Sequence, residues 1–288
     1  MRNLNYQLKL LCRRNRDGSY ATRVDRERQL TAIANQLHNL GYRGMSINSL
    51  RQKHVQSLVD LWLDQQVSAG TIKNRMAHMR WWAEKINRSS VIANANIYYG
   101  IPDRQFVSSV NKAVSLSKED FQRINDPFVR MSLQLQQAFG LRREEALKIC
   151  PHWADRQTYL RLKSGWTKGG RPRTIPIISV EQRAVLEAAK KLAAWGSLIP
   201  ADLTYVRQLR RYEHACTYAG LSKLHGLRHA YAQARYRALT GWNCPSAGGP
   251  NRPQLTADQR RGDRAARLQI SAELGHEREQ ITAVYLGR

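Results

Sequence analysis

The last eighteen residues of the chain, Ser271 to Arg288, read S-A-E-L-G-H-E-R-E-Q-I-T-A-V-Y-L-G-R. Gly275 and His276 form a turn after one helical segment, and a short amphipathic run then carries Tyr285. A single tyrosine in such a place is usually a half-buried residue that packs against a helix. Its meaning here depends on a series of basic residues earlier in the chain.

Three short basic motifs precede this stretch in order. Gly140-Leu-Arg142 joins two predicted helices, and the turn Lys168-Gly-Gly-Arg-Pro172 lies between two β-rich segments. His225-Gly-Leu-Arg228 opens another helix, and His276 and Tyr285 follow nine residues apart. Any one of these motifs is common in a basic protein, as a helix junction, a surface turn or a pair of residues on one helix face.

Together, these side-chain types fit the cleavage of a phosphodiester without a metal. A tyrosine hydroxyl, with a reference pKa of about 10, is a nucleophile that needs a base or a cationic pocket. Arginine offers a planar fork to a phosphate, and lysine or histidine can protonate a leaving oxygen. The candidates are Tyr285 as nucleophile, Arg142 and Arg228 on the phosphate, and Lys168 or a histidine as acid.

The net charge of the chain points to a polyanionic partner. The 288 residues include 47 Lys and Arg against 22 Asp and Glu, a formal charge of +25. Nucleic acid is the first expectation and an anionic membrane surface the second. Aromatic residues make up only 8%, which argues against binding of single strands by stacking.

The four cysteines are widely spaced and form no C-x-x-C pair, so we expect reduced thiols in a cytoplasmic protein. No apolar run reaches the roughly 18 residues of a membrane span, and no signal peptide is evident. The positions of Cys, His, Asp and Glu complete no metal-ligand motif, and H-E-x-x-H is absent. A metal enzyme is therefore a minor alternative.

Helical periodicity dominates residues 1–92. Helices are expected over 23–40, 49–66 and 71–87, the last capped by Thr71, after a basic segment that ends near Asp17. Lys73 and Arg80 lie together on one flank of the last helix, where we expect contacts with DNA phosphates. Residues 93–116 are irregular and predict an interdomain linker.

A second domain is predicted over 117–288, beginning with a capping box at Ser117. Helices are expected over 128–139, 144–149, 180–195, 205–219, 225–239 and 256–274, with two strands at 158–162 and 173–178. Arg142 then lies at a helix N-terminus, which favours an anion. The fold class is mainly α, in two domains, with a small antiparallel sheet in the second.

The motif series resembles the active site of the tyrosine recombinases, the phage integrase family. The phrases H-G-L-R-H-A-Y-A and L-G-H-x8-Y carry the resemblance, which covers 117–288 well and the N-terminal helices more loosely. It implies an N-terminal, SAM-like core-binding domain and a C-terminal catalytic domain. It also implies site-specific cleavage and rejoining of DNA through a 3′-phosphotyrosine, in the service of a mobile element, with no metal or nucleotide cofactor.

By the family pattern, a set of six residues surrounds the scissile phosphate: Arg142, Lys168, His225, Arg228, His276 and Tyr285. Lys168 would protonate the 5′-oxygen, Glu145 would orient Arg142, and His229 would be a structural neighbour. Arg171 and Arg173, beside the lysine turn, are further candidates for DNA contacts. The implied partners are a double-stranded recombination site, three further copies of the chain on DNA, and accessory DNA-bending or directionality proteins. The implied location is the nucleoid of a prokaryotic cytoplasm.

Two features depart from the family pattern. Gly241 to Asp263 is an insertion between His225 and His276, and only three residues follow Tyr285, where many relatives have a helix that docks on the next subunit. We therefore expect a monomer in free solution, with the Pro/Gly-rich insertion reaching outward to a subunit contact on DNA. Two alternative functions are a non-catalytic DNA-binding regulator and an enzyme like the type IB topoisomerases.

Overall fold

The computed structural model describes residues 2–276 and 278–288, and the chain divides into two compact units. The first ends at Gln105 and the second runs from Phe106 to Arg288. Both are mainly helical, and the second holds a two-stranded antiparallel sheet, as the fold class predicted. Among the helices in these ranges, none is long and apolar enough to cross a membrane.

The first unit contains four α-helices: α1 (Asn3–Arg14), α2 (Tyr20–Asn39), α3 (Gln52–Asp64) and α4 (Ala69–Lys85). Their apolar faces meet in one core, in which the indoles of Trp62 and Trp82 are fully buried. Each indole N–H has an acceptor, Gln36 Oε1 at 3.0 Å and the Ile47 carbonyl at 3.1 Å respectively. The two large rings therefore enter the core without an unsatisfied donor.

The N-cap of helix α4 lies three residues before the expected one. Ser68 is the N-cap residue, and its hydroxyl accepts a hydrogen bond from the Thr71 amide, so the prediction of a Thr71 cap was wrong. Trp81, on the flank of this helix, donates to Asp17 Oδ2 at 2.9 Å, and the Arg26 guanidinium lies 4.1 Å from its ring centroid. The turn before α2 is thereby tied to α4.

The segment expected to form the start of the linker packs on the first unit. Tyr99, at the end of the 3-10 turn η3 (Asn96–Tyr99), and Ile101 are buried in its core. The Tyr99 hydroxyl accepts a hydrogen bond from the Ala93 amide at 2.9 Å. Aromatic burial thus keeps residues 93–101 on this unit, although their irregular, Asn-rich sequence resembles a linker.

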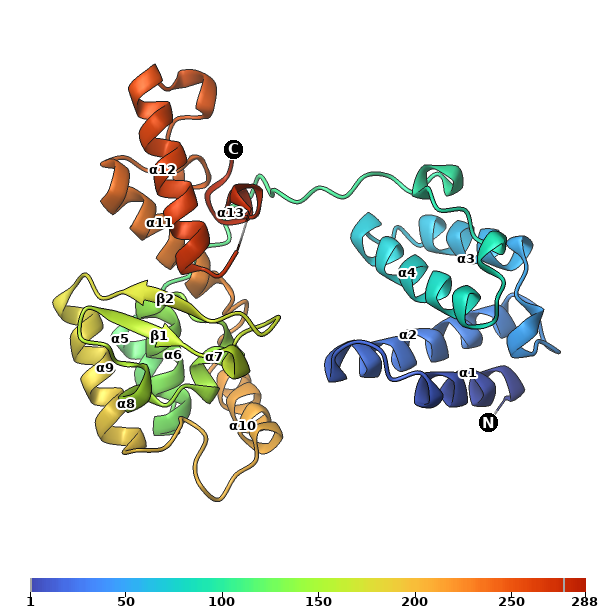
Figure 1. Ribbon diagram of the computed structural model, residues 1–288, viewed down its shortest axis with the longest axis horizontal. Helices are drawn as coiled ribbons and strands as arrows, with labels where there is room; N and C mark the ends of the chain where they lie inside the picture. The colour runs from blue at the N-terminus through green and yellow to red at the C-terminus, as the bar shows by residue number, and fades with distance from the viewer. Residues whose placement is uncertain (1, 277) are drawn as a thin grey trace. The chain divides into compact units, whose positions relative to one another are not determined.

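The second unit contains nine named helices among its described residues. They are α5 (Lys118–Gln122), α6 (Pro127–Phe139), α7 (Arg143–Lys148), α8 (Pro151–Ala154), α9 (Val180–Ala193), α10 (Tyr205–Tyr218), α11 (Gly226–Thr240), α12 (Ala257–Glu273) and α13 (Glu279–Leu286). Helix α6 contacts α7, α9 and α11, and α11 also packs along α12 and α13 (Figure 1). This packing brings helices from both ends of the unit to one place.

The sheet pairs β1 (Tyr159–Leu162) with β2 (Arg173–Pro176), and Leu162 lies opposite Arg173. Leu160, Leu162 and Ile175 face the core, because alternate residues of a strand point to the same side. Arg173 lies two residues before Ile175 and shares its inward face. The loop between the strands includes η4 (Ser164–Trp166) and carries Lys168 at its exposed end.

The inserted segment, residues 241–263, packs on the second unit instead of reaching outward. Cys244 is fully buried, and the turn η5 (Pro245–Ala247) contacts α13. At Gly287 an added Cβ would lie 2.8 Å from the Ser246 amide nitrogen, so the chain after Tyr285 runs directly against this turn. The expectation of an outward-reaching loop was wrong for this part of the insertion, because its buried residues complete the core around α13.

Candidate active site

The site begins at the junction of α6 and α7. Gly140 ends α6 in the left-handed conformation, with φ of 60°, and an added Cβ would lie 2.5 Å from Tyr231 Cδ1. The chain then turns so that Arg142 becomes the N-cap of α7. The Glu145 carboxylate reaches back to the Arg142 amide at 2.7 Å and to Arg142 Nη1 at 2.8 Å. Arg142 is therefore fixed from both its backbone and its side chain.

Glu145 is fully buried and is shared between two arginines. Arg173 donates Nη1 and Nη2 to its two oxygens at 2.7 and 2.6 Å, in a bidentate pair. Burial alone would raise the pKa of Glu145, but the hydrogen bonds and charge of Arg173, together with the charge of Arg142, hold this pKa at about 2. The carboxylate is ionised at neutral pH and acts as the anionic centre of the cluster.

Arg228, on α11, is among the most deeply buried charged residues of the unit. Its Nη1 donates to the Gly140 carbonyl at 2.5 Å, and its Nη2 donates to the Leu274 carbonyl. Burial lowers the pKa of Arg228 to about 10, which still leaves the guanidinium charged at neutral pH. Its Nε donates to the Tyr285 hydroxyl, so three hydrogen-bonded donors in a fixed fork give this cation one orientation.

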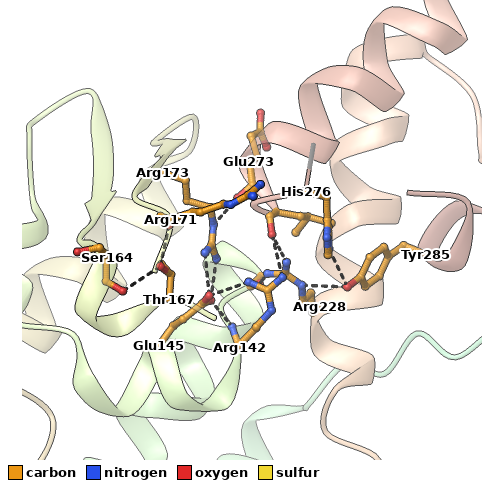
Figure 2. A network of polar contacts seen from close by, with 12 residues as sticks. Arg142, Glu145, Ser164, Thr167, Arg171, Arg173, Arg228, Glu273, His276 and Tyr285 are labelled. Atoms are coloured by element: carbon orange, nitrogen blue, oxygen red, sulfur yellow. Dashed lines mark hydrogen bonds and ion pairs between the residues drawn. The ribbon is translucent and has the colours of Figure 1, made fainter. Parts of the chain in front are cut away.

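The C-terminal end of α12 collects three arginines. Its Leu274 carbonyl also accepts from Arg142 Nη2 at 3.3 Å, and its Glu273 carbonyl accepts from Arg173 Nε at 2.9 Å. Terminal helix carbonyls have no partner within the helix and carry the negative end of its dipole, so cations stabilise them. Figure 2 shows the arginines converging on this point from α7, α11 and the sheet.

Tyr285 closes the cluster from α13. Its hydroxyl oxygen lies 3.3 Å from Arg228 Nε and 3.4 Å from His276 Nε2 (Figure 2). The ring is buried, with 5% of its surface exposed, and Gln233 Nε2 donates to the Tyr285 carbonyl at 3.1 Å. The tyrosine is thus held by residues of its own chain, next to a buried guanidinium and an imidazole.

Three histidine rings surround the tyrosine ring. The centroids of His229, His276 and His225 lie 4.7, 5.9 and 6.2 Å from that of Tyr285. Loss of water around the rings, and then the nearby positive charges, lower the pKa of His276 and of His229 to about 4. The pKa of His225, at the edge of the site, is lowered for the same reasons. His276 and His229 are therefore neutral at pH 7.

The loop that carries Lys168 is closed by a hydrogen bond within the loop itself. Thr167 Oγ1 donates to the Arg171 carbonyl at 2.7 Å, which closes the turn around Gly169 and Gly170. Lys168 is exposed, and its ammonium has no hydrogen bond or ion pair with any residue whose side chain the structure describes. Arg171 is exposed on the same loop, close to Arg173 in Figure 2. Seven of the eight expected catalytic and supporting groups, all except Lys168, thus lie around Tyr285 and Glu145.

Three of the expected DNA contacts are engaged within the protein. Arg173 is buried and its guanidinium is paired with Glu145, so its expected contact with DNA stays a prediction. In the first unit, Arg80 donates to the Ala93 carbonyl at 3.0 Å and to Asn96 Oδ1 at 2.8 Å, and it holds residues 93–96 on α4. Lys73 pairs with Asp103 at 2.9 Å. Helix-face periodicity could not reveal these partners, because they come from a later, irregular segment.

The sequence motifs did not predict that Arg173 pairs with Glu145, or that the carbonyls at the end of α12 accept hydrogen bonds from arginines. Period-two alternation from Ile175 does place Arg173 on the inward face of its strand, and that signal was available. No comparable signal marks the carbonyls, since every residue has one. Among residues 2–276 and 278–288, no group of three His, Cys, Asp or Glu side chains is placed to hold a metal ion.

Known protein families match most of the chain. Residues 1–91 match the family of phage integrase N-terminal domains, and residues 106–234 match the integrase family. The second match includes Arg142 and Arg228 and ends before His276 and Tyr285. Among curated proteins, none matches the sequence significantly.

Solved structures resemble the whole chain in fold. A lambda integrase dimer bound to a COC′ core site has a TM-score of 0.61 at 14% identity, over 99% of this chain and 78% of that one. The Tn1549 transposon integrase with circular intermediate DNA has a TM-score of 0.59 at 12% identity, over 100% and 96%. The XerH site-specific recombinase bound to its difH substrate has a TM-score of 0.58 at 15% identity, over 99% and 81%. The two family matches, the fold and the converging arginine–histidine–tyrosine cluster together show that this chain belongs to the phage integrase family of tyrosine recombinases.

Proposed function

We propose that the chain is a site-specific DNA recombinase that cleaves and rejoins strands through a 3′-phosphotyrosine and integrates or excises a mobile element. One observation carries the proposal: the Tyr285 hydroxyl lies within hydrogen-bonding distance of a buried arginine, Arg228, and of a neutral histidine, His276. A nucleophile, a cation and a base thereby lie at one point, although Arg228 is 57 residues and His276 nine residues from Tyr285 in the chain.

Arg142 and Arg228 would bind the two non-bridging oxygens of the scissile phosphate. Each has N–H groups beyond those bonded to Glu145, Gly140 and Leu274, and both side chains are already oriented by those bonds. Cations fixed before the substrate arrives need little reorganisation as charge develops on the phosphate oxygens. Glu145 keeps Arg142 in place and offsets the repulsion between the guanidinium groups.

In the cleavage step, the Tyr285 oxygen attacks phosphorus and the bond from phosphorus to the 5′-oxygen breaks. The phenolic proton passes to Nε2 of the neutral His276, and Lys168 gives a proton to the leaving 5′-oxygen. The exposed lysine is on a loop that the DNA would have to order, which fits its lack of a partner among the described residues. Attack of a 5′-hydroxyl on the phosphotyrosine reverses each transfer and rejoins a strand.

Two further histidines would support this arrangement. His225 lies at the entrance of the site and is a hydrogen-bond donor for the phosphate, whereas His229 is buried and packs against the Tyr285 ring. The first unit, residues 1–92 in the sequence-based division, would serve as the core-binding domain, joined to a catalytic domain that begins at 117.

The proposed function as a recombinase also implies its partners. The matched structures include DNA complexes, among them a lambda integrase tetramer bound to a Holliday junction. We infer that this chain acts as four copies on a double-stranded recombination site and is a monomer without DNA. Accessory DNA-bending or directionality proteins and a place on the prokaryotic nucleoid belong to the same proposal.

A covalent trapping experiment tests the function without knowledge of the target sequence. The protein is incubated with a library of randomised, nicked duplexes, from which cleavage releases a short 5′ fragment so that rejoining fails. After denaturation, DNA that remains linked to protein is recovered and sequenced. We expect one enriched sequence with the wild type and none with Tyr285→Phe, at nearly unchanged DNA affinity, since affinity rests on many phosphate contacts.

The same experiment separates the alternatives. A non-catalytic regulator would bind the library without forming an adduct, and an enzyme like the type IB topoisomerases would form adducts with little sequence enrichment. An adduct that persists in Tyr285→Phe would refute the assignment of the nucleophile.

A further inference from the structure

A second concentration of arginine lies in the catalytic unit, outside the cluster around Tyr285. A cleft of about 510 Å³ lies between the turn η6 (Arg252–Gln254), α12 and α13. Its lining includes five arginines and one carboxylate: Arg252, Arg260, Arg264, Arg267, Arg288 and Asp263. The inserted segment contributes the first two of these arginines, so the insertion builds one wall of the cleft.

The carboxylate in the lining does not neutralise the cleft. Asp263 Oδ1 accepts hydrogen bonds from the Tyr236 hydroxyl at 2.6 Å and from Arg267 Nε at 2.8 Å. Arg267 also donates Nη1 to the Gly287 carbonyl at 2.9 Å and is buried. The Asp263 carboxylate is therefore already bonded to one arginine and one tyrosine. No other acidic side chain in the lining is available to the remaining guanidinium groups.

The arrangement of these arginines costs stability in the absence of an anion. Arg260, Arg264 and Arg267 lie on one face of α12 at the i, i+4, i+7 spacing, where like charges repel one another and destabilise a helix. Arg260 also donates to the Arg252 and Pro253 carbonyls at 3.3 and 3.4 Å, and so it ties the insertion to the helix. In the part of the chain that the structure describes, neither Arg252 nor Arg264 has a hydrogen bond or ion pair from its guanidinium group.

We propose that this cleft binds backbone phosphates of DNA, at a position separate from the scissile phosphate. The guanidinium fork matches a phosphate, and a polar cleft of this size accommodates a short run of backbone. Arg264 precedes Leu274 by ten residues, which corresponds to about 15 Å along α12 at the rise of an α-helix. A phosphate bound at Arg264 is therefore not the one held between Arg142 and Arg228.

A second copy of the chain is a poorer occupant than DNA. The chain has 22 acidic residues, no three of which are consecutive, so it offers no acidic segment to match five arginines. The proposal rests on the proposed function only in taking DNA as the ligand. Because Ala283 of α13 also lines the cleft, DNA bound there contacts the same helix that carries Tyr285.

The test removes two cleft charges and compares them with two charges elsewhere. The cleft variant is Arg252→Gln with Arg264→Gln, and the control is Arg237→Gln with Arg261→Gln. Both control residues are exposed, Arg261 on the same helix and paired with Asp258, and neither lines the cleft. Binding of a 30-base-pair duplex of arbitrary sequence is measured by fluorescence anisotropy over a range of KCl concentrations. Thermal unfolding of both variants confirms that they fold.

The slope of log K against log salt concentration reports the number of phosphates contacted, at about 0.9 per phosphate. We expect the cleft variant to lose about one to two units of this slope and the control to keep the wild-type slope. Equal slopes for the two variants would overturn the proposal. So would a change in self-association of the DNA-free protein, measured by analytical ultracentrifugation, without a change in slope, because the cleft would then be a contact between subunits. The readout is non-covalent, so it stands whether or not Tyr285 forms an adduct.

Discussion

Removing the charge of Glu145 tests the electrostatic account of the site. In Glu145→Gln, the bidentate pair with Arg173 and the bond to Arg142 Nη1 lose their anionic partner. The pKa of Glu145 is about 2 in the folded protein against an ordinary value of 4.5, and the side chain is fully buried. At 1.36 kcal/mol per pKa unit, this difference corresponds to about 3 kcal/mol of stability at pH 7.

The sign of the pH dependence follows from the lowered pKa. The contribution of Glu145 is present in full above the unfolded pKa of 4.5, and it is lost as the pH falls toward the folded pKa of about 2. At pH 3, about 1 kcal/mol of it remains. The difference in unfolding free energy between wild type and Glu145→Gln should therefore shrink by about 2 kcal/mol from pH 7 to pH 3.

Urea unfolding followed by tryptophan fluorescence measures this difference at each pH, and the transition of the second unit is the relevant one. Glu144→Gln is the matched control, since Glu144 lies on the same helix, is exposed and pairs only with Lys148 at i+4. We expect the control to change stability by no more than about 0.5 kcal/mol. A difference for Glu145→Gln that stays constant from pH 7 to pH 3 would refute the reasoning.

Four further predictions concern the reaction and the backbone. Covalent adduct formation should survive EDTA, because Arg142 and Arg228 replace a metal, and loss with chelator followed by rescue with Mg²⁺ would contradict this. Lys168→Ala should fail to cleave ordinary DNA yet cleave a substrate with a 5′-bridging sulfur, which leaves without a proton; equal loss on both would make Lys168 a phosphate contact only. Gly140→Ala should lower stability by about 2–4 kcal/mol through φ strain and overlap with Tyr231, against about 1 kcal/mol for Gly220→Ala, which has open space around it. Analytical ultracentrifugation should find a monomer without DNA, and a stable DNA-free tetramer would contradict the proposed assembly.

The sequence was sufficient to predict most of the longer helices, because their apolar residues repeat at the helical period and their ends carry strong caps and glycines. Thr256 and Ser117 cap α12 and α5 as capping-box residues, and Gly140 and Gly241 end α6 and α11 in the left-handed conformation. These signals are local, so they do not depend on the rest of the fold. The start of α4 was misplaced because Ser68 and Thr71 are both good caps, and only the packing of the helix selects between them.

The motifs also point to residues that the structure brings together, since order and residue type are visible in a chain. Direct contacts join side chains from motifs that are far apart in sequence: Arg142, Glu145, Arg228, His276 and Tyr285. What a basic residue contacts was not predictable in this way. A long cationic side chain has no preferred partner in its own segment, and its partner is set by whichever segment the fold brings within reach.

Tertiary structure alone decided which cations are structural and which remain available. Arg173 is bonded to Glu145, and Arg80 is bonded to the Ala93 carbonyl. Arg252 and Arg264 instead come together in a cleft that no single segment of sequence reveals. The same packing turns the insertion inward against α13, because burying Cys244 and covering Gly287 removes more surface from water than an extended loop would. Local periodicity determines the elements, but the charges of this protein acquire their roles only from contacts between residues distant in the chain.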